Sequence, residues 1–167
     1  MAISKKIDKL SHWTSLVTRE IDGEIFHSIK PADYVTVLAV TKDGKIPLVK
    51  QYRMAAEQIT LEFPGGLVDE DPEKSALQEL EEEVGFTARQ LIFLGEFFPD
   101  SGRLDNKMWM YFTNQVVPVE NWRPEERLER TLVTRAELKK MILSGQFNHA
   151  LHLGVIGVAL IKGLFDL

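Results

Sequence analysis

The sequence predicts an α/β fold, in which helices sandwich a mixed sheet and an antiparallel hairpin comes first. Three observations support this prediction. Short β-branched and apolar segments separated by turn residues fill the first third of the chain. A helix with clear signals at both ends follows them. Strands and helices then alternate, and this mixed order is typical of an α/β sandwich.

Two hairpins are predicted in the first third of the chain. Asp22-Gly23 and Asp43-Gly44 are dipeptides that favour tight hairpin turns. Pro31 ends the second strand of the first hairpin, and Pro64 follows the last strand expected in this part of the chain. The expected strands cover residues 13–19, 24–29, 34–40, 46–52 and 58–63.

The central helix has the best-defined ends in the sequence. Asp71 suits the N-cap, Pro72 the first helical position, and Gly85 the position after the last turn. After this helix we expect strands at 91–97 and 108–117 and a polar loop at 121–129. Thr134 is expected to cap a helix that runs to about residue 143, and a final helix is expected at 148–161.

Length and composition indicate one globular domain. The chain has 167 residues, of which 44% are hydrophobic and 27% charged. The absence of cysteine excludes disulfides, thiolate metal sites and cysteine nucleophiles. A net charge of -5 argues against a protein that binds nucleic acid by neutralising phosphates. We find no signal-peptide core and no membrane-spanning stretch, so we expect a cytoplasmic protein without a membrane partner.

The central helix is strongly acidic near its end. At about 100° per residue, Glu79, Glu82 and Glu83 share an arc beside the apolar face, whereas Glu81 points away. Like charges at this spacing, placed in the last helical turns, destabilise a helix. A bound divalent cation would reverse both effects, and carboxylate oxygens suit Mg²⁺ or Mn²⁺. The arc therefore predicts a metal site, with a solvated acidic face as the alternative.

Residues 65–86, read GGLVDEDPEKSALQELEEEVGF, resemble the signature of the Nudix hydrolases. The second half of that signature is Arg-Glu-apolar-any-Glu-Glu-any-Gly-apolar, and here it reads QELEEEVGF. The segments KQYR at 50–53 and LEFPGG at 61–66 are similar to the ADP-ribose pyrophosphatase branch. Two features depart from the pattern: Gln78 replaces the arginine, and the stretch between Gly66 and Glu79 is two residues shorter.

The resemblance implies a Nudix-type α/β/α sandwich and assigns site residues by position. The implied Mg²⁺ ligands, with Mn²⁺ as the alternative ion, are the Gly65 carbonyl, Glu79, Glu82 and Glu83. The implied substrate contacts are Arg53, Glu62 and Arg103; their structural alternatives are a strand-end cation, a rim carboxylate and a turn residue. The implied general base is Glu126, with Glu125 and Glu129 as its neighbours on the same loop. The alternative is that these three carboxylates only solvate the loop, and the next candidate for the base is then Glu82.

These features predict a metal-dependent hydrolase that cleaves the pyrophosphate bond of a nucleoside diphosphate sugar. ADP-ribose is the favoured substrate, giving AMP and ribose 5-phosphate. The alternatives are hydrolysis of GDP-mannose or a nucleoside triphosphate, or nucleotide binding without turnover. Residues 1–30 are expected to form a hairpin region that joins a homodimer, and residues 31–167 the hydrolase domain. A small-molecule nucleotide is the expected partner, and nucleic acid is not.

Overall fold

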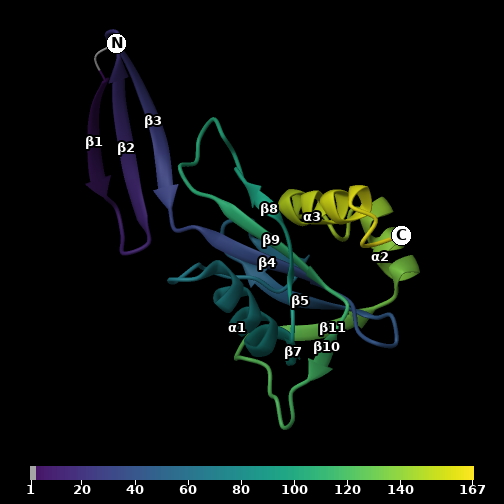
Figure 1. The fold of residues 1–167 in the computed structure, drawn as a ribbon. Helices are drawn as coiled ribbons and strands as arrows, with labels where there is room; N and C mark the ends of the chain where they lie inside the picture. The colour runs from purple at the N-terminus through teal and green to yellow at the C-terminus, as the bar shows by residue number, and fades with distance from the viewer. Residues whose placement is uncertain (1–2) are drawn as a thin grey trace.

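The computed structural model describes residues 3–167 (Figure 1). The first two residues of the predicted 1–30 hairpin region lie outside the described residues. The strands are β1 (Ile3–Lys9), β2 (Thr14–Ile21), β3 (Glu24–Pro31), β4 (Tyr34–Ala39), β5 (Ile46–Arg53), β6 (Gln58–Glu62), β7 (Phe86–Ala88), β8 (Ile92–Phe97), β9 (Met108–Thr113), β10 (Val116–Pro118) and β11 (Glu129–Val133). The helices are α1 (Pro72–Val84), α2 (Arg135–Leu143) and α3 (Ala150–Ile161).

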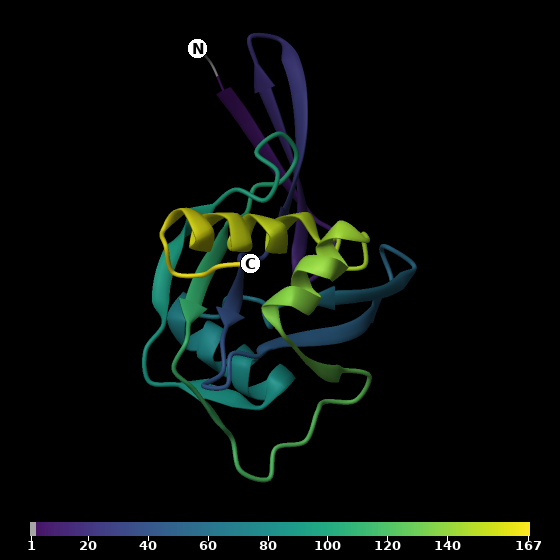
Figure 2. The ribbon, with the colours of Figure 1, turned by 90° about the vertical axis from the view of Figure 1, so that its right-hand side faces the viewer.

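The body of the molecule has helices on both sides of its strands. Strand β4 runs parallel to β9, whose other neighbour β8 is antiparallel, and β5 lies antiparallel between β11 and β6. Helix α1 covers one side, and α2 and α3 cover the other (Figures 1 and 2). Among the helices of residues 3–167, none combines the length and apolarity that crossing a membrane requires.

Strand β4 shows how the sequence produces this layering. Its side chains alternate between the two faces of the strand. Val35 and Val37 belong to the cluster under α1, which contains Leu80. Leu38 belongs to the opposite cluster with Val155 of α3. Both clusters are buried, which confirms the predicted α/β/α sandwich around a mixed sheet.

The N-terminal hairpin is part of a three-stranded sheet that projects from the body (Figures 1 and 2). The predicted turn is confirmed, because Asp22 and Gly23 have φ values of 52° and 88°. Strand β1 was not predicted, because its run of charged residues gives a weak strand pattern and its pairing with β2 supplies the missing order. The sheet joins the body where the Ile29 N–H donates to the Arg103 carbonyl at 2.8 Å.

Several predicted boundaries differ from the structure by one or two residues, and three differences concern pairing or the start of a helix. The single strand expected at 108–117 is interrupted after β9, so that β10 can pair with β7. Strand β11 was not predicted, and its first residue, Glu129, was expected in the polar loop; antiparallel pairing with β5 supplies its order. Helix α3 begins at Ala150, two residues later than predicted. Tertiary pairing decided the two strand boundaries.

Candidate functional site

Helix α1 has the predicted ends, and they set which side chains reach the site. The Asp71 carboxylate accepts hydrogen bonds from the backbone N–H groups of Glu73 and Lys74, at 2.9 and 3.0 Å. Gly85 adopts φ 67° and donates its N–H to the Glu81 carbonyl at 3.0 Å. These caps confirm the helix that the sequence predicted over 72–84.

The loop after β6 is held against β4 by backbone hydrogen bonds. The Val35 N–H donates to the Gly66 carbonyl oxygen at 2.8 Å, and the Val37 N–H donates to the Pro64 carbonyl oxygen at 2.9 Å. A Cβ atom on Gly65 would lie 2.2 Å from the Val35 carbonyl oxygen, so only glycine fits this approach. A Cβ atom on Gly66 would lie 2.0 Å from Oε1 of Glu79. The loop and the acidic helix are therefore in direct contact.

Two of the predicted carboxylates lie together at this loop. Glu83 is 8% exposed, and its Oε2 accepts the Gly65 N–H at 2.8 Å. Burial raises the pKa of Glu83 to about 8, and the charge of Glu79 adds to the effect although the Gly65 hydrogen bond opposes it. Burial, with the charges of Glu82 and Glu125, raises the pKa of Glu79 to about 7. Two crowded carboxylates of this kind fit a divalent cation, which would favour their ionised forms.

The third predicted ligand, Glu82, lies at the exposed rim. Its Oε1 accepts a hydrogen bond from Nε2 of Gln78 at 2.9 Å. Gln78 stands where the signature has arginine, and it therefore contacts an acidic side chain without neutralising it. The structure thus brings Glu79 and Glu83 to the Gly65–Gly66 loop and leaves Glu82 exposed beside them.

Arg53 and Glu62, which were predicted to contact the substrate, bind each other. Nε and Nη2 of Arg53 donate to the two oxygens of Glu62 at 2.8 and 2.6 Å, and the Thr60 hydroxyl donates to Oε1 at 2.6 Å. Burial alone would raise the pKa of Glu62, but these hydrogen bonds outweigh it and lower the pKa to about 2. The Arg53 side chain is 46% exposed and keeps further N–H groups for a ligand.

A cavity of about 410 Å³ lies beside this pair and the glycine loop. Several polar residues that line it were not predicted, because they come from three separate parts of the chain. The only sequence signal was the i, i+3 spacing of two histidines at the start of the last helix. The missed residues are Tyr34, Asn106, His149 and His152.

The loop between β10 and β11 is anchored to the end of α1 (Figure 2). Nε1 of Trp122 donates to the Glu82 carbonyl at 3.0 Å, and Nη1 of Arg130 donates to the Val84 carbonyl at 2.9 Å. The Arg130 guanidinium also lies 4.5 Å from the centroid of the Trp122 ring. The anchored loop brings Glu125 close enough to Glu79 to raise its pKa, and it holds Glu126 in an exposed position.

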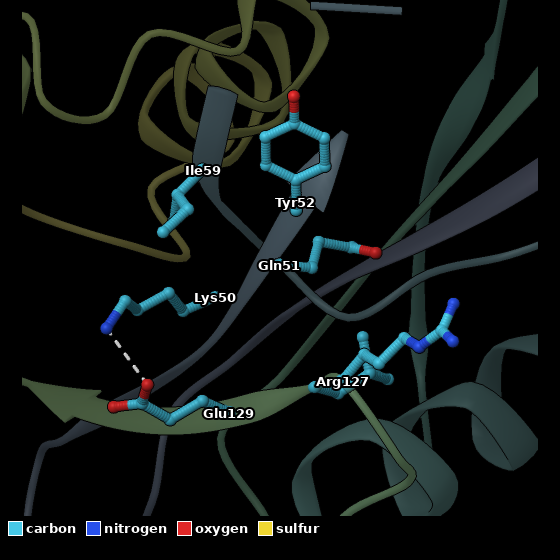
Figure 3. Close-up of a pocket in the computed structure, with 7 residues that line it drawn as sticks. Lys50, Gln51, Tyr52, Ile59, Arg127 and Glu129 are labelled. Atoms are coloured by element: carbon cyan, nitrogen blue, oxygen red, sulfur yellow. Dashed lines mark hydrogen bonds and ion pairs between the residues drawn. The ribbon is translucent and has the colours of Figure 1, made fainter. Parts of the chain in front are cut away.

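The remaining predicted residues lie elsewhere. Glu129 pairs with Lys50 at 2.9 Å, beside a second cavity of about 350 Å³ in which Arg127 points away from that pair (Figure 3). The acidic residues of α1 line neither cavity, but the first cavity reaches Gly65 and Gly66, which contact Glu83 and Glu79. The Arg103 side chain is 87% exposed and lies 3.9 Å from Asp100, and Arg103 is not among the residues that line the first cavity.

Comparison with known proteins agrees with this geometry. The chain is 36% identical over 121 residues to the ADP-ribose pyrophosphatase of Bacillus subtilis, covering 70% of this chain and 65% of that protein. It is 30% identical over 152 residues to the ADP-ribose pyrophosphatase of Mycobacterium tuberculosis, covering 86% and 69%. A crystal structure of an ADP compounds hydrolase shares the fold, with a TM-score of 0.75 and 21% identity over 99% of this chain and 95% of that one. The match to the Bacillus protein thus spans slightly less than two thirds of that relative's length. The model of the NUDIX domain matches residues 30–150, and the chain therefore belongs to the Nudix family.

Proposed function

We propose that this protein is a metal-dependent hydrolase of nucleoside diphosphate sugars, with ADP-ribose as the favoured substrate. The observation that carries the proposal is the contact of Glu79 and Glu83 with the Gly65–Gly66 loop, next to the exposed edge of Arg53. The relatives named ADP-ribose pyrophosphatase support the choice of substrate.

Glu79, Glu83, the rim carboxylate Glu82 and the Gly65 carbonyl are the proposed metal ligands. Hard oxygen donors of this kind suit Mg²⁺, with Mn²⁺ as the alternative. When bound, such an ion polarises phosphoryl oxygens and lowers the pKa of a water molecule. The raised pKa values of Glu79 and Glu83 support this assignment, because burial and neighbouring carboxylates disfavour their ionised forms, and for Glu83 these effects outweigh the nearby charge of Arg53.

The chain's own residues have separate roles in the proposed reaction. The free N–H groups of Arg53 bind the substrate phosphates, and Glu62 holds the guanidinium in place. A loop carboxylate, Glu126 or its neighbour Glu125, accepts a proton from the attacking water. Water adds to a phosphorus of the pyrophosphate and the bridging P–O bond breaks, so that ADP-ribose gives AMP and ribose 5-phosphate.

A substrate panel tests the proposal. Purified protein would be incubated with ADP-ribose, GDP-mannose or ATP in the presence of Mg²⁺, Mn²⁺ or EDTA, and the products separated by chromatography. We expect metal-dependent release of AMP from ADP-ribose, little from Glu83→Gln, and near-normal release from the matched exposed variant Glu81→Gln. Preferential turnover of GDP-mannose or ATP would support the alternative substrates. Nucleotide binding without any product would instead support a domain that lacks turnover.

A homodimer formed through the N-terminal sheet is also part of the proposal. Within residues 3–167, no helix and no second sheet packs over these three strands (Figures 1 and 2), and the sheet carries large exposed apolar side chains. These are Ile7, Leu10, Trp13, Ile25 and Phe26, which are 52, 60, 58, 63 and 50% exposed. A partner subunit is the cover that best accounts for this apolar surface. The cytoplasmic location stays a prediction of the sequence.

A further inference from the structure

Two side chains, one from the loop after β10 and one from β11, bind the last turn of α1. Nε1 of Trp122 donates to the Glu82 carbonyl at 3.0 Å, and Nη1 of Arg130 donates to the Val84 carbonyl at 2.9 Å. A helix leaves the carbonyl groups of its last turn without partners inside the helix, so these two bonds satisfy acceptors that α1 cannot satisfy itself. The two residues that accept them flank Glu83, the buried carboxylate at the glycine loop.

The same two side chains stand on either side of the residues proposed as the general base. Trp122 precedes Glu125 and Glu126 in the chain, and Arg130 follows them on β11 (Figure 2). The charge of Glu125 reaches Glu79 of α1 and contributes to the raised pKa of that carboxyl. The loop is thus attached to α1 on both sides of the proposed base, and the attachment points on α1 lie on both sides of a proposed metal ligand.

The attachment is packed as well as hydrogen-bonded. The guanidinium carbon of Arg130 lies 4.5 Å from the ring centroid of Trp122 and 5.5 Å from that of Phe86. The Trp122 ring lies so close to the helix end that a Cβ atom on Gly85 would be 2.3 Å from it. The backbone of Arg130 pairs with Val49 of β5, so the sheet fixes the strand from which this side chain extends.

The charge of Arg130 also suits this place. Helix α1 has glutamates at 81, 82 and 83 and no basic residue in its last turn, although the C-terminal end of a helix favours cations. Gln78, at the arginine position of the signature, binds Glu82 without neutralising it. Arg130 brings a positive charge to this end of α1 from a different strand. It therefore combines a hydrogen bond with a charge that the end of the helix lacks in its own sequence.

We propose that Arg130, together with Trp122, is a positioning residue that sets the place of the base-carrying loop relative to the last turn of α1. The inference rests on the proposed function and deepens it, because a general base must lie within hydrogen-bond reach of the attacking water. Arg130 does not touch the substrate in this role; it acts by holding Glu125 or Glu126 in a fixed place relative to Glu83. A displacement of about 1 Å can lower a rate about 100-fold, so a loosened loop should slow turnover without unfolding the protein.

The test measures turnover of ADP-ribose with Mg²⁺ by Arg130→Ala and Arg130→Lys. Arg123→Ala is the matched control, because Arg123 is exposed on the same loop and its loss changes the net charge equally. Arg130→Ala should lower kcat about 10-fold or more, while KM and the half-saturating Mg²⁺ concentration stay within about twofold of wild type. Arg130→Lys keeps the charge without the planar group that stacks on Trp122, so it should recover part of the loss.

Three results of these assays would overturn the inference. They are an unchanged kcat in Arg130→Ala, an equal loss in Arg123→Ala, and a loss that saturating Mg²⁺ abolishes, which would place the effect on the metal ligands and not on the loop. In each case metal-dependent hydrolysis by the wild type would still support the proposed function.

A double-mutant cycle separates positioning from a general structural effect. When Arg130→Ala is added to whichever of Glu125→Gln and Glu126→Gln lowers kcat, the further loss should be less than about twofold, because the loop then has no base to place. An undiminished further loss would overturn the inference. Near-normal kcat in both glutamine variants would do so as well, because the base would then lie outside the loop.

A measurement without turnover tests the attachment by itself. If the wild type hydrolyses none of the nucleotides, the proposed function fails, and hydrogen–deuterium exchange still decides whether Arg130 orders the loop. Peptides covering residues 119–129 should exchange faster in Arg130→Ala than in wild type or in Arg123→Ala. Equal exchange in all three proteins would overturn the positioning role.

Discussion

Replacing Glu83 by glutamine should stabilise the metal-free protein while removing its activity. Glu83 is 8% exposed and lies close to Glu79, so ionising it is unfavourable. Glutamine has nearly the same shape, and its Oε1 can still accept the Gly65 N–H. It cannot ionise, so it loses both the electrostatic cost of a buried charge and the ability to hold a cation strongly.

The expected size follows from the pKa of Glu83, which rises from 4.5 to about 8. One pKa unit corresponds to about 1.4 kcal/mol, so complete ionisation costs at most about 5 kcal/mol. Local rearrangement and water entry relieve part of this cost, and we expect about 2 kcal/mol. In a chain of this length each kcal/mol shifts Tm by about 2–4 °C, so Glu83→Gln should melt about 4–8 °C above wild type once Glu83 is ionised.

The difference in Tm between Glu83→Gln and wild type should depend on pH. A carboxyl whose pKa is raised on folding contributes stability below its unfolded pKa of 4.5, and this stability is lost as the pH rises through about 8. The melting difference should therefore grow between about pH 5 and pH 9 in buffer with EDTA. Added Mg²⁺ should raise the Tm of wild type and not that of the variant. Glu81→Gln, at an exposed position, is the control and should melt like wild type at every pH.

Differential scanning fluorimetry over this pH range is a sufficient assay. A Glu83→Gln variant that melted below wild type at the alkaline end without metal would contradict an unfavourable buried charge at Glu83. The role of Glu83 as a metal ligand would equally fail if Mg²⁺ stabilised both proteins to the same extent, because the ion would then bind independently of Glu83.

Four further predictions concern the loops and the N-terminal sheet. Gly66→Ala should displace the flexible Glu79 carboxylate and lower turnover at least about 10-fold. In Gly65→Ala the added Cβ meets the Val35 backbone, so this variant should lower Tm strongly. Activity assays and melting curves distinguish the two effects. If Glu126 or Glu125 is the base, its Gln variant should lower kcat by about 10²–10⁴ with little change in KM, and near-normal kcat in both variants would move the base to Glu82. Trp122→Phe removes the hydrogen bond to the Glu82 carbonyl and should lower kcat for ADP-ribose with only a small change in Tm. An unchanged kcat would show that this hydrogen bond is dispensable for turnover. Light scattering at micromolar concentration should find a dimer that Phe26→Asp dissociates, and a wild-type monomer would disprove the interface.

Local chemistry was sufficient to predict much of the fold. The Asp22-Gly23 turn, the caps of α1 at Asp71 and Gly85, and the Thr134 N-cap of α2 depend on interactions within a few residues, so the sequence displays them directly. The helical period likewise placed Glu79 and Glu83 on one side of α1. Strand β1 was missed because its charged residues give a weak strand pattern, whereas β7 and β11 were missed because their order comes from pairing with the distant strands β10 and β5.

In the candidate site, too, the sequence identified residues but not their long-range contacts. Periodicity, together with the family resemblance, identified the acidic residues of α1, but it could not show that Glu82 stays at the rim while Glu83 is buried against Gly65. Pairing partners such as Arg53 and Glu62 are nine residues apart and meet only because β5 and β6 form a hairpin.

Tertiary structure alone decided the cavity. Tyr34, Asn106 and His149 lie in three regions of the chain, and apart from the i, i+3 spacing of His149 and His152 no sequence pattern marks them as a site. The sequence contains the residues and their local conformations, because hydrogen bonds and side-chain sterics within a few positions determine those. Which distant polar groups line one cavity depends on how the two layers of helices pack over the strands, and that packing involves the whole core.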